Sequence, residues 1–580
     1  MWQMMLKPVC FRSLLHRPIH TRWTGGVGSG VNLSRTFRTT VRRKEPMVRD
    51  TKCDPGDQDD LFRYTSGRWL INEKYQLEQR FVKFNVNNLC SQAASLFGPE
   101  TKCVRIVKME GNFNKAFLLT MNDGNEVIEK IPCPNSGTPS LTTASEVATL
   151  KFLRSRISIR VPEVYAWNSD PTNPVGAEYI IMEKVRGVAL AERWETMNTL
   201  ERYQIIDRIV EMEKELDNLK LPAYGNLFLQ DSLPSDYRQY PLPADLDPTG
   251  LFCIGPSCSR AHNASIDISK SNVGPWTSIL DFALSIPRRE LALIANERQK
   301  VQRHLTQFSE NQSVDEYGDL LRKVLLILPA LSHHPRVLEG ADSAIWHTDL
   351  HLGNIYVSSD NPTKIEGVID WQSAQAAPLF IQAQFPEFLR PPRDYSPGTE
   401  IPALPDNFDE LDPDEKERVA KEQTSAGQSK YYEMSCLAYN KPVYDAMKLD
   451  RGLWEPFTCC QLFSNGSLVP LRNSLIRIFQ DWEFLGLPGS CPFEFTEEDL
   501  RRHNEQVQQY QDYVYLWDLA KSQLCTDDSG WVPIEQWEPT NKMNEYLCDM
   551  YVKALSEEMP PEVASKRWPF PPGCSLDTSV

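Results

Sequence analysis

Apolar and polar residues alternate along residues 104–132, and the alternation is interrupted twice, first by GNFN and then by NDG. A period of two residues is typical of β-strands that bury one face, and asparagine and glycine at the interruptions are typical of tight turns. The segment therefore predicts three short antiparallel strands joined by two turns.

The flanking segments extend this small sheet. Residues 59–98 include an amphipathic helix, and residues 142–156 have a helical period that starts behind threonines suited to cap a helix. Two apolar stretches, at 161–170 and 177–185, predict two more strands. We expect a sheet whose third and fourth strands are joined by one helix.

From about residue 190 the apolar spacing becomes helical, through 277–297 and on to a run that ends at Leu331. Residues 230–276 are rich in Pro, Asn and Ser and predict a long surface loop or insertion. Helices follow again after residue 372, where the charged run 408–423 indicates a solvated helix face and the aromatic-rich segment 509–520 indicates core packing. The whole pattern predicts an α+β protein, with a small antiparallel sheet followed by a large helical region.

Composition narrows the classes of partner. The net charge of −16 argues against a nucleic-acid-binding surface as the main function, and the longest apolar run, residues 324–331, is too short to span a bilayer. We therefore expect a soluble protein with no membrane-spanning segment. The fourteen cysteines are scattered without a CxxC pair, which favours reduced core cysteines over a zinc site.

The first 44 residues contain no Asp or Glu but carry nine Lys or Arg, with Ser, Thr and Gly between them. Large apolar and basic residues in the first seventeen positions could separate onto two faces of one helix. This composition is typical of a mitochondrial transit peptide, which we place at residues 1–49, and a basic disordered tail is the alternative.

The sequence WHTDLHLGN at 346–354, followed by VIDWQ, concentrates polar side chains in one short loop. Three readings compete. A metal site would use His347, Asp349 and His351, but no further ligand completes a tetrahedral set. A structural polar turn would account for His347 and not for the order of the acidic and amide side chains. Phosphoryl transfer accounts for all of them.

Phosphoryl transfer needs a carboxylate for the acceptor hydroxyl and oxygen ligands for magnesium. Asp349 can supply the first, and Asn354 and Asp370 the second. The reaction also needs a cation on a strand, held by an acid on the following helix, and Lys130 and Glu146 occupy such places. A turn over the phosphates is the last requirement, and the single-glycine segment with Gly111 and Asn112 is a weak candidate for it.

The motifs HTDLHLGN and VIDW, in this order, resemble the aminoglycoside phosphotransferase (choline kinase-like) family, over most of residues 60–390. Within it, LFRYTSGRW and NFNKAFLLTM resemble a fungal mitochondrial group, the altered inheritance of mitochondria protein 9 group. The resemblance implies a two-lobed protein-kinase-like fold, ATP and Mg²⁺ as cofactors, Asp349 as catalytic base, and a hinge that meets adenine through its backbone, formed by Met182, Glu183, Lys184 and Val185.

Two features depart from the family pattern. Gln372 stands where many members carry a second acid, which puts a second metal position in doubt, and the turn at Gly111 lacks GxGxxG. The sequence thus predicts a mitochondrial (matrix) Mg-ATP-dependent phosphotransferase with a small-molecule acceptor. Its domains are an N-lobe at 50–186 and a helical C-lobe at 187–580, with a catalytic loop at 346–372. A kinase-like pseudoenzyme that acts through protein partners, and an enzyme that transfers AMP, are the alternatives.

Overall fold

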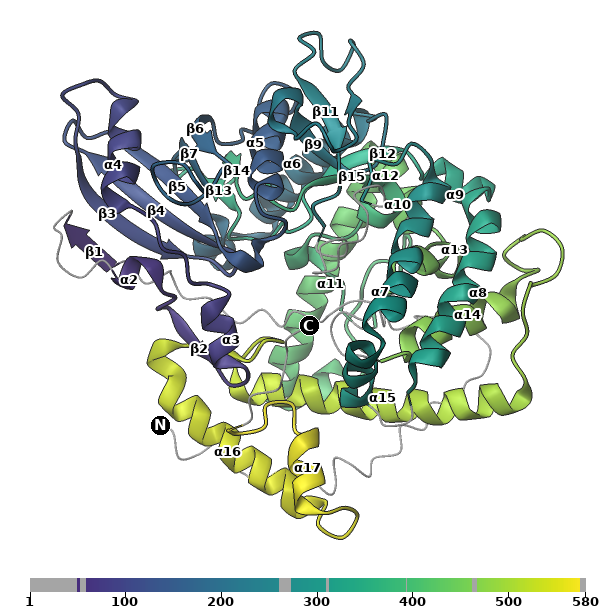
Figure 1. Ribbon diagram of the computed structural model, residues 1–580. Helices are drawn as coiled ribbons and strands as arrows, with labels where there is room; N and C mark the ends of the chain where they lie inside the picture. The colour runs from purple at the N-terminus through teal and green to yellow at the C-terminus, as the bar shows by residue number, and fades with distance from the viewer. Residues whose placement is uncertain are drawn as a thin grey trace.

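The computed structural model describes residues 49–52, 59–259, 273–308, 312–392, 394–461 and 467–573. Apart from residue 49, the predicted transit peptide lies outside these residues. The protein has two lobes (Figure 1), a small one built on an antiparallel sheet and a larger helical one, so the predicted α+β fold class is confirmed.

The N-lobe sheet has six strands in the order β1-β3-β4-β5-β7-β6, and every neighbouring pair is antiparallel. Its three central strands match the alternation in the sequence and are joined by the two expected turns. The strands are β1 (Arg49–Lys52), β3 (Cys103–Glu110), β4 (Asn114–Met121), β5 (Glu126–Pro132), β6 (Val164–Asn168) and β7 (Tyr179–Glu183).

The two faces of this sheet are covered by different helices. Every second residue of β4 is buried, and Phe117 and Leu119 pack with Leu89 of α4 (Val86–Ser95) in one core cluster. On the opposite face, α5 (Leu141–Leu153) packs Val147 against Ile180 of β7. The alternation of strand side chains thus sends one set to each helix.

The C-lobe is a helical core with short strand pairs on its side facing the sheet. α6 contributes Ile206 and Ile209 to this core and α8 contributes Leu321 and Leu328, and all four are fully buried. β12 (Ser343–Trp346) pairs with β15 (Gln375–Pro378), and β13 (Ile355–Val357) pairs with β14 (Ile365–Val368) on one side and with β8 (Val188–Ala189) on the other. The helices are α6 (Thr199–Asn218), α7 (Ile279–Phe308), α8 (Val314–Ser332), α9 (Pro335–Glu339), α10 (Leu379–Gln382), α11 (Pro413–Tyr439), α12 (Lys441–Met447), α13 (Arg451–Trp454) and α14 (Val469–Asp481).

The segment 230–276 differs from the expected surface loop. In its described part, β10 (Tyr240–Pro241) and β11 (Phe252–Gly255) form a sheet with β9 (Asn226–Leu229), and β11 is fully buried. Cys253 and Phe228 pack with Leu141 of α5. A four-residue apolar run is too short to identify a strand when Pro and Gly surround it, and only the packing reveals it.

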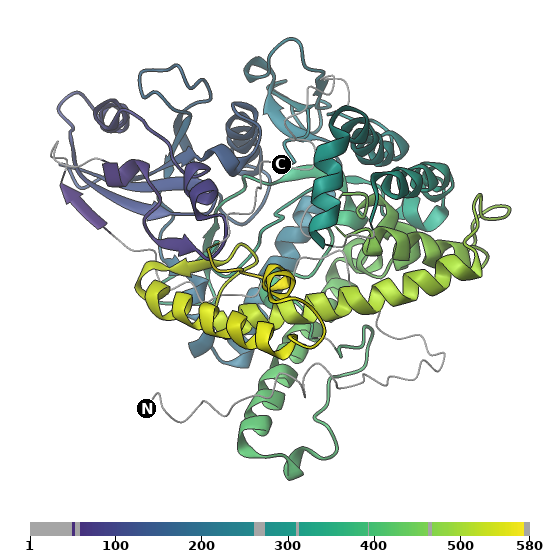
Figure 2. The same ribbon diagram turned by 60° about the horizontal axis from the view of Figure 1, so that its bottom comes forward.

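The C-terminal segment returns to the N-lobe. α15 (Glu497–Leu524) runs beneath the helical lobe towards the N-lobe, and α16 (Trp537–Ala554) and α17 (Pro561–Arg567) lie below α3 (Glu73–Glu78), which follows α2 (Asp59–Phe62) and β2 (Gly67–Trp69) (Figure 1 and Figure 2). β16 (Trp531–Pro533) pairs with β2, and Leu70 joins the core of the C-terminal helices. In the predicted core segment 509–520, Tyr510 and Leu516 are buried, although Tyr515 is exposed.

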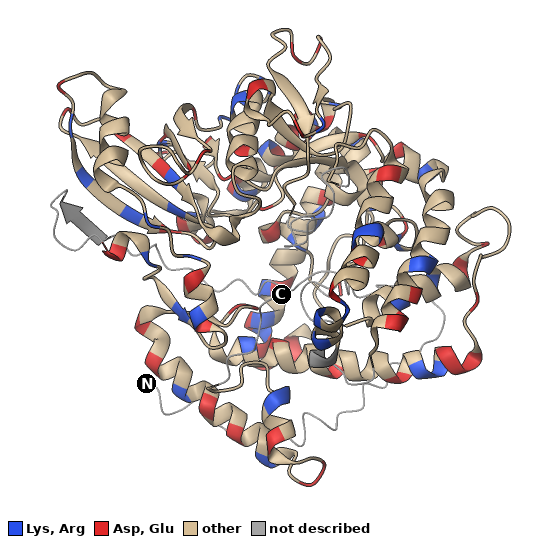
Figure 3. Cartoon of the chain, in the orientation of Figure 1, with Lys and Arg blue, Asp and Glu red and all other residues tan. Residues whose placement is uncertain are grey.

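Residues of both charges occur along α15 and α16 (Figure 3). Most residues of the charged run 408–423 are exposed, as expected of a solvated helix face. Among the described residues, the helices are too short or too polar to cross a bilayer.

Candidate active site

Lys130 of β5 connects the two lobes. Its Nζ is 2.7 Å from Glu146 Oε1 on α5 and 2.8 Å from Asp370 Oδ1, which follows β14 in the C-lobe. The side chains of Lys130 and Glu146 are 10% and 4% exposed, whereas that of Asp370 is 38% exposed. Three residues predicted from distant parts of the sequence therefore lie together, with Asp370 as the one open to solvent.

The position of Glu146 depends on how α5 begins. Ser140 precedes the helix with a φ of 63° and makes no side-chain cap. Glu178, just before β7, holds this end of the helix instead: it accepts from the Ser140 N–H at 2.8 Å and from the Thr143 hydroxyl at 2.6 Å. α5 is thus fixed to the sheet one turn before Glu146.

Lys130 and Asp370 are held in their charged forms. Burial disfavours the charge on Lys130, but Asp370 and Glu146 outweigh it and raise its pKa. Burial likewise disfavours ionised Asp370, but the Lys130 ammonium outweighs it and keeps the pKa of Asp370 below its usual range. The cation and the carboxylate are therefore both charged at neutral pH.

Asp349 and Asn354 lie on the loop between β12 and β13. Asn354 is buried, and its Nδ2 donates to the Asp349 carbonyl at 3.0 Å. Its own carbonyl accepts from the Ile369 N–H at 2.9 Å, and His347 Nε2 lies 2.9 Å from the Ile369 carbonyl. These bonds join the loop of Asp349 to the residue just before Asp370, so the two segments keep a fixed relation.

The two loop histidines serve the backbone. His347 Nε2 must carry its proton to bond the Ile369 carbonyl, and burial lowers the pKa of His347, so the ring is neutral. His351 Nδ1 accepts from the Gly353 N–H at 3.0 Å. Across the part of the chain that the structure describes, no group of three or more His, Cys, Asp or Glu could hold a metal ion.

Asn354 and Asp370 fit a hard cation better than a soft one. The hydrogen bond of Asn354 uses its Nδ2, and the ion pair of Asp370 with Lys130 uses Oδ1, which leaves Asn354 Oδ1 and Asp370 Oδ2 for a ligand. Magnesium takes carboxylate and amide oxygens together with phosphate oxygens. The donor set therefore fits magnesium bound with a nucleotide.

Residues 111–113, which we call the glycine turn, join β3 to β4. The Gly111 N–H donates to the Asn114 carbonyl at 3.1 Å, and the Asn112 carbonyl accepts from Asn135 Nδ2 at 3.1 Å. The turn is thus closed on itself and tied to the loop that follows β5.

The four predicted hinge residues lie at the end of β7 and just beyond it. Met182 and Val185 are buried. The other two side chains form ion pairs within the N-lobe: Glu183 with Arg154 and Arg160, and Lys184 with Glu126. Met182 and Glu183 also pair with β5 through their backbone, whereas Lys184 and Val185 follow the strand.

Several polar residues around the site escaped the sequence reasoning. Glu178, Asn114 and Asn135 position the helix and the turn, and the sequence noted Gln372 only as a departure from a family pattern. Their contacts cross from one chain segment to another, so no local pattern marks them.

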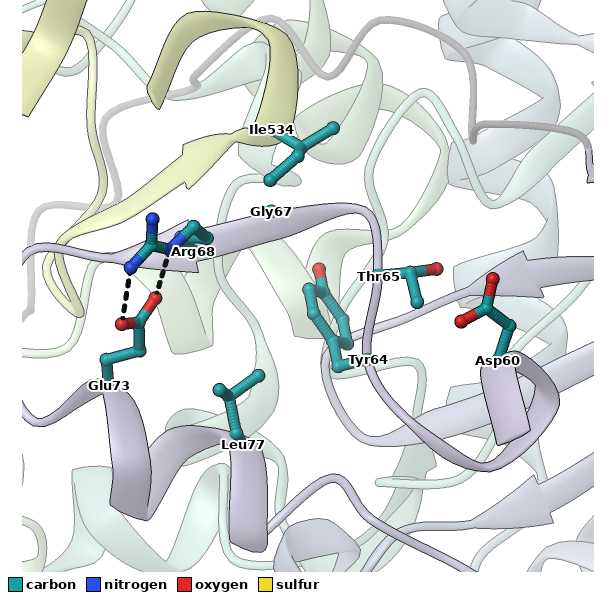
Figure 4. Close-up of a pocket in the computed structure, with 8 residues that line it drawn as sticks. All are labelled: Asp60, Tyr64, Thr65, Gly67, Arg68, Glu73, Leu77 and Ile534. Atoms are coloured by element: carbon teal, nitrogen blue, oxygen red, sulfur yellow. Dashed lines mark hydrogen bonds and ion pairs between the residues drawn. The ribbon is translucent and has the colours of Figure 1, made fainter. Parts of the chain in front are cut away.

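A pocket of about 390 Å³ lies away from these residues (Figure 4), between β2, α3 and Ile534. Tyr64 and the Arg68–Glu73 ion pair, which joins Arg68 Nε to Glu73 Oε1 at 2.6 Å, line it. None of the predicted site residues lines this pocket.

Comparison with known proteins places the chain in a family. The model of the phosphotransferase enzyme family matches residues 109–381. A subtelomeric hrmA-associated cluster protein of Aspergillus fumigatus is 30% identical over 508 residues, which cover 81% of this chain and 97% of the relative. The mitochondrial altered inheritance of mitochondria protein 9 of Candida tropicalis is 23% identical, over 88% of this chain and 90% of the relative.

Among solved structures, the streptomycin–ATP–APH(2'')-IIa ternary complex is similar with a TM-score of 0.35 and 13% identity, over 68% of this chain and 97% of that one. The family model and the Aspergillus relative, which aligns with this chain over nearly its whole length, lead to one conclusion. This chain belongs to the phosphotransferase enzyme family.

Proposed function

We propose that this protein is a mitochondrial phosphotransferase that uses magnesium and ATP to phosphorylate a hydroxyl group of a small molecule. The observation that carries the proposal is the contact of the buried Lys130 with both Glu146 and Asp370. This contact joins the Lys130 ammonium, on the sheet, to the carboxylate of Asp370, which is held beside the loop of Asp349. In this proposal residues 50–186 form the nucleotide-binding lobe and residues 187–580 the acceptor lobe.

Each residue then has one role. Lys130 and the glycine turn orient the phosphates, and the hinge backbone at 182–185 meets the adenine. Asp349 accepts the proton of the acceptor hydroxyl, and the hydroxyl oxygen bonds to the γ-phosphorus. The bond from that phosphorus to the oxygen that bridges it to the β-phosphate breaks, and ADP leaves. Bound magnesium, held by Asn354 and Asp370, would neutralise charge on the phosphates. The net charge of −16 supports an acceptor other than a nucleic acid.

The reaction is tested by incubating the purified protein with ATP labelled at the γ-phosphate and an extract of mitochondrial metabolites. We expect label on a small molecule. A parallel incubation uses ATP labelled at the α-phosphate, and label transferred from this ATP but not from the γ-labelled ATP would replace phosphorylation by AMP transfer. Magnesium-dependent ATP binding without any transfer would favour the pseudoenzyme.

Asp349→Asn tests the catalytic role. The amide keeps the shape of the side chain but cannot take a proton, so transfer should fall by about 10²–10⁴-fold while Mg-ATP affinity, measured by calorimetry, is retained. Asp360→Asn, the same change at an exposed position of the next loop, should leave transfer unchanged. Wild-type transfer rates for Asp349→Asn would remove Asp349 from the mechanism.

The location is supported by the acid-free basic N-terminus and by relatives whose names call them mitochondrial. The full chain should become protected from added protease by isolated mitochondria, and a chain that begins at Asp50 should not. Protection of the shortened chain would show that residues 1–49 are not the targeting signal.

A further inference from the structure

Gln372 lies two residues after Asp370 and is 8% exposed. Its Oε1 accepts from Asn114 Nδ2 at 2.5 Å, and its Nε2 donates to the Ser136 carbonyl at 3.4 Å. The first bond spans 258 positions of the chain and the second 236, and both cross from the C-lobe to the N-lobe. One buried amide therefore contacts two separate parts of the nucleotide-binding lobe.

The two partners belong to the segments that carry the proposed nucleotide contacts. Asn114 closes the glycine turn, because its carbonyl accepts the Gly111 N–H. Ser136 lies in the loop from β5 to α5, between Lys130 and Glu146. Gln372 itself extends the segment of Asp370, so the turn, the loop and the metal-binding segment all meet at its side chain.

An amide suits this place better than the acid that many family members carry. A carboxylate could accept from Asn114 but has no N–H for the Ser136 carbonyl, and it would put a second negative charge two residues from Asp370. The amide serves both partners without charge. Buried hydrogen bonds of this kind are strong enough to hold two segments in one relation.

We propose that Gln372 is a positioning residue, an interlobe latch that holds the glycine turn closed over the phosphates and slows the release of bound nucleotide. The inference rests on the proposed function, because it requires Mg-ATP to bind between the lobes. It gives Gln372 a role in place of the second metal ligand that the family pattern suggests.

The test measures the dissociation rate of a fluorescent ATP analogue with magnesium from the full chain by stopped flow. Gln372→Ala and Asn114→Ala should each speed release by about three- to tenfold, the effect of losing one hydrogen bond. Because both variants break the same bond, the double variant should release no faster than the faster single one. Gln372→Glu, which still accepts from Asn114, should fall between Gln372→Ala and the wild type.

Gln230→Ala is the matched control, since the Gln230 side chain, just after β9, also donates to backbone carbonyls, but to those of Gly250 and Phe252 rather than to a segment of the site; its release rate should equal that of the wild type. Gln372→Asn keeps the amide one methylene shorter and should behave as Gln372→Ala, so the test survives if the alanine variant does not fold. The latch would be overturned if the Gln372 and Asn114 variants released the analogue at the wild-type rate. It would also be overturned if the rate increases of the two single variants multiplied in the double variant. A wild-type protein that binds no nucleotide would instead overturn the proposed function.

Discussion

The buried ion pair of Lys130 and Glu146 affects the unfolding free energy through each of its two charges. Lys130→Met would leave Glu146 buried without its cation, and such a loss usually costs about 3–5 kcal/mol of unfolding free energy. Adding Glu146→Gln removes the orphan charge and should recover most of the loss in urea unfolding. Lys441→Met, which breaks an exposed ion pair with Asp445, should change stability by at most about 1 kcal/mol. A double variant no more stable than Lys130→Met would contradict this account.

Glu213 makes stability depend on pH. Burial raises the pKa of this carboxyl from an ordinary 4.5 to about 8, although the Tyr432 hydroxyl bonded to it at 2.7 Å acts in the opposite direction. Between these two values the folded protein keeps a proton that the unfolded chain has released. The contribution to stability is therefore complete below pH 4.5 and is lost as the pH rises through 8.

Glu213→Gln keeps an acceptor for Tyr432 without an ionisable group. Compared with the wild type, this variant should gain unfolding free energy as the pH rises from 5 to 9, which urea unfolding at three pH values can measure. Glu211→Gln, on the exposed face of the same helix, should follow the wild type at every pH. Parallel curves for Glu213→Gln and wild type would refute the raised pKa.

The sequence could indicate Lys130, Glu146 and Asp370 because their order along the chain follows the order of turn, strand, helix and loop. It could not indicate the contact of Asn114 with Gln372. Both are ordinary polar residues in their local patterns, and only the folded backbone brings them within 2.5 Å across 258 positions.

At the scale of elements, β2 and β16 approach so closely that one position admits only glycine. A Cβ on Gly67 would lie 2.4 Å from Trp531 Nε1 and 2.6 Å from the Val532 carbonyl oxygen, which is backbone and cannot swing aside. Gly67→Ala should therefore lower the unfolding free energy and open this strand pair to limited proteolysis. Gly427→Ala, the same change where the helix leaves open space, should be neutral or slightly stabilising. Equal stability of the two variants would refute the close approach.

The spacing of apolar residues along the sequence predicted the alternating strands of the N-lobe and the long helices. The fold class followed from these elements. The sheet of β9, β10 and β11 did not, because its strands have two to four residues and owe their form to packing against α5. Short elements like these are fixed by tertiary contacts, which a local pattern does not contain.

At the scale of the whole molecule, a ligand bound between the lobes should stabilise both. Mg-ATP at 100 times its Kd should add about 2.7 kcal/mol to the unfolding free energy and raise the melting temperature. Asp370→Ala should lose the dependence of this shift on magnesium, and Asp360→Ala should keep it. A magnesium-dependent shift that persists in Asp370→Ala would mean that the metal is bound elsewhere.

The pairing of β2 with β16 also sets when the molecule can be completed. Trp69 donates to the Ser529 hydroxyl at 3.1 Å across 460 positions. A ribosome makes the N-terminal end first, so β2 emerges long before its partner strand exists. Such distant contacts slow folding, because a very long loop must close before they form. The support beneath the N-lobe is thus assembled late, and a chain cut short before residue 531 leaves that lobe without its partner strand.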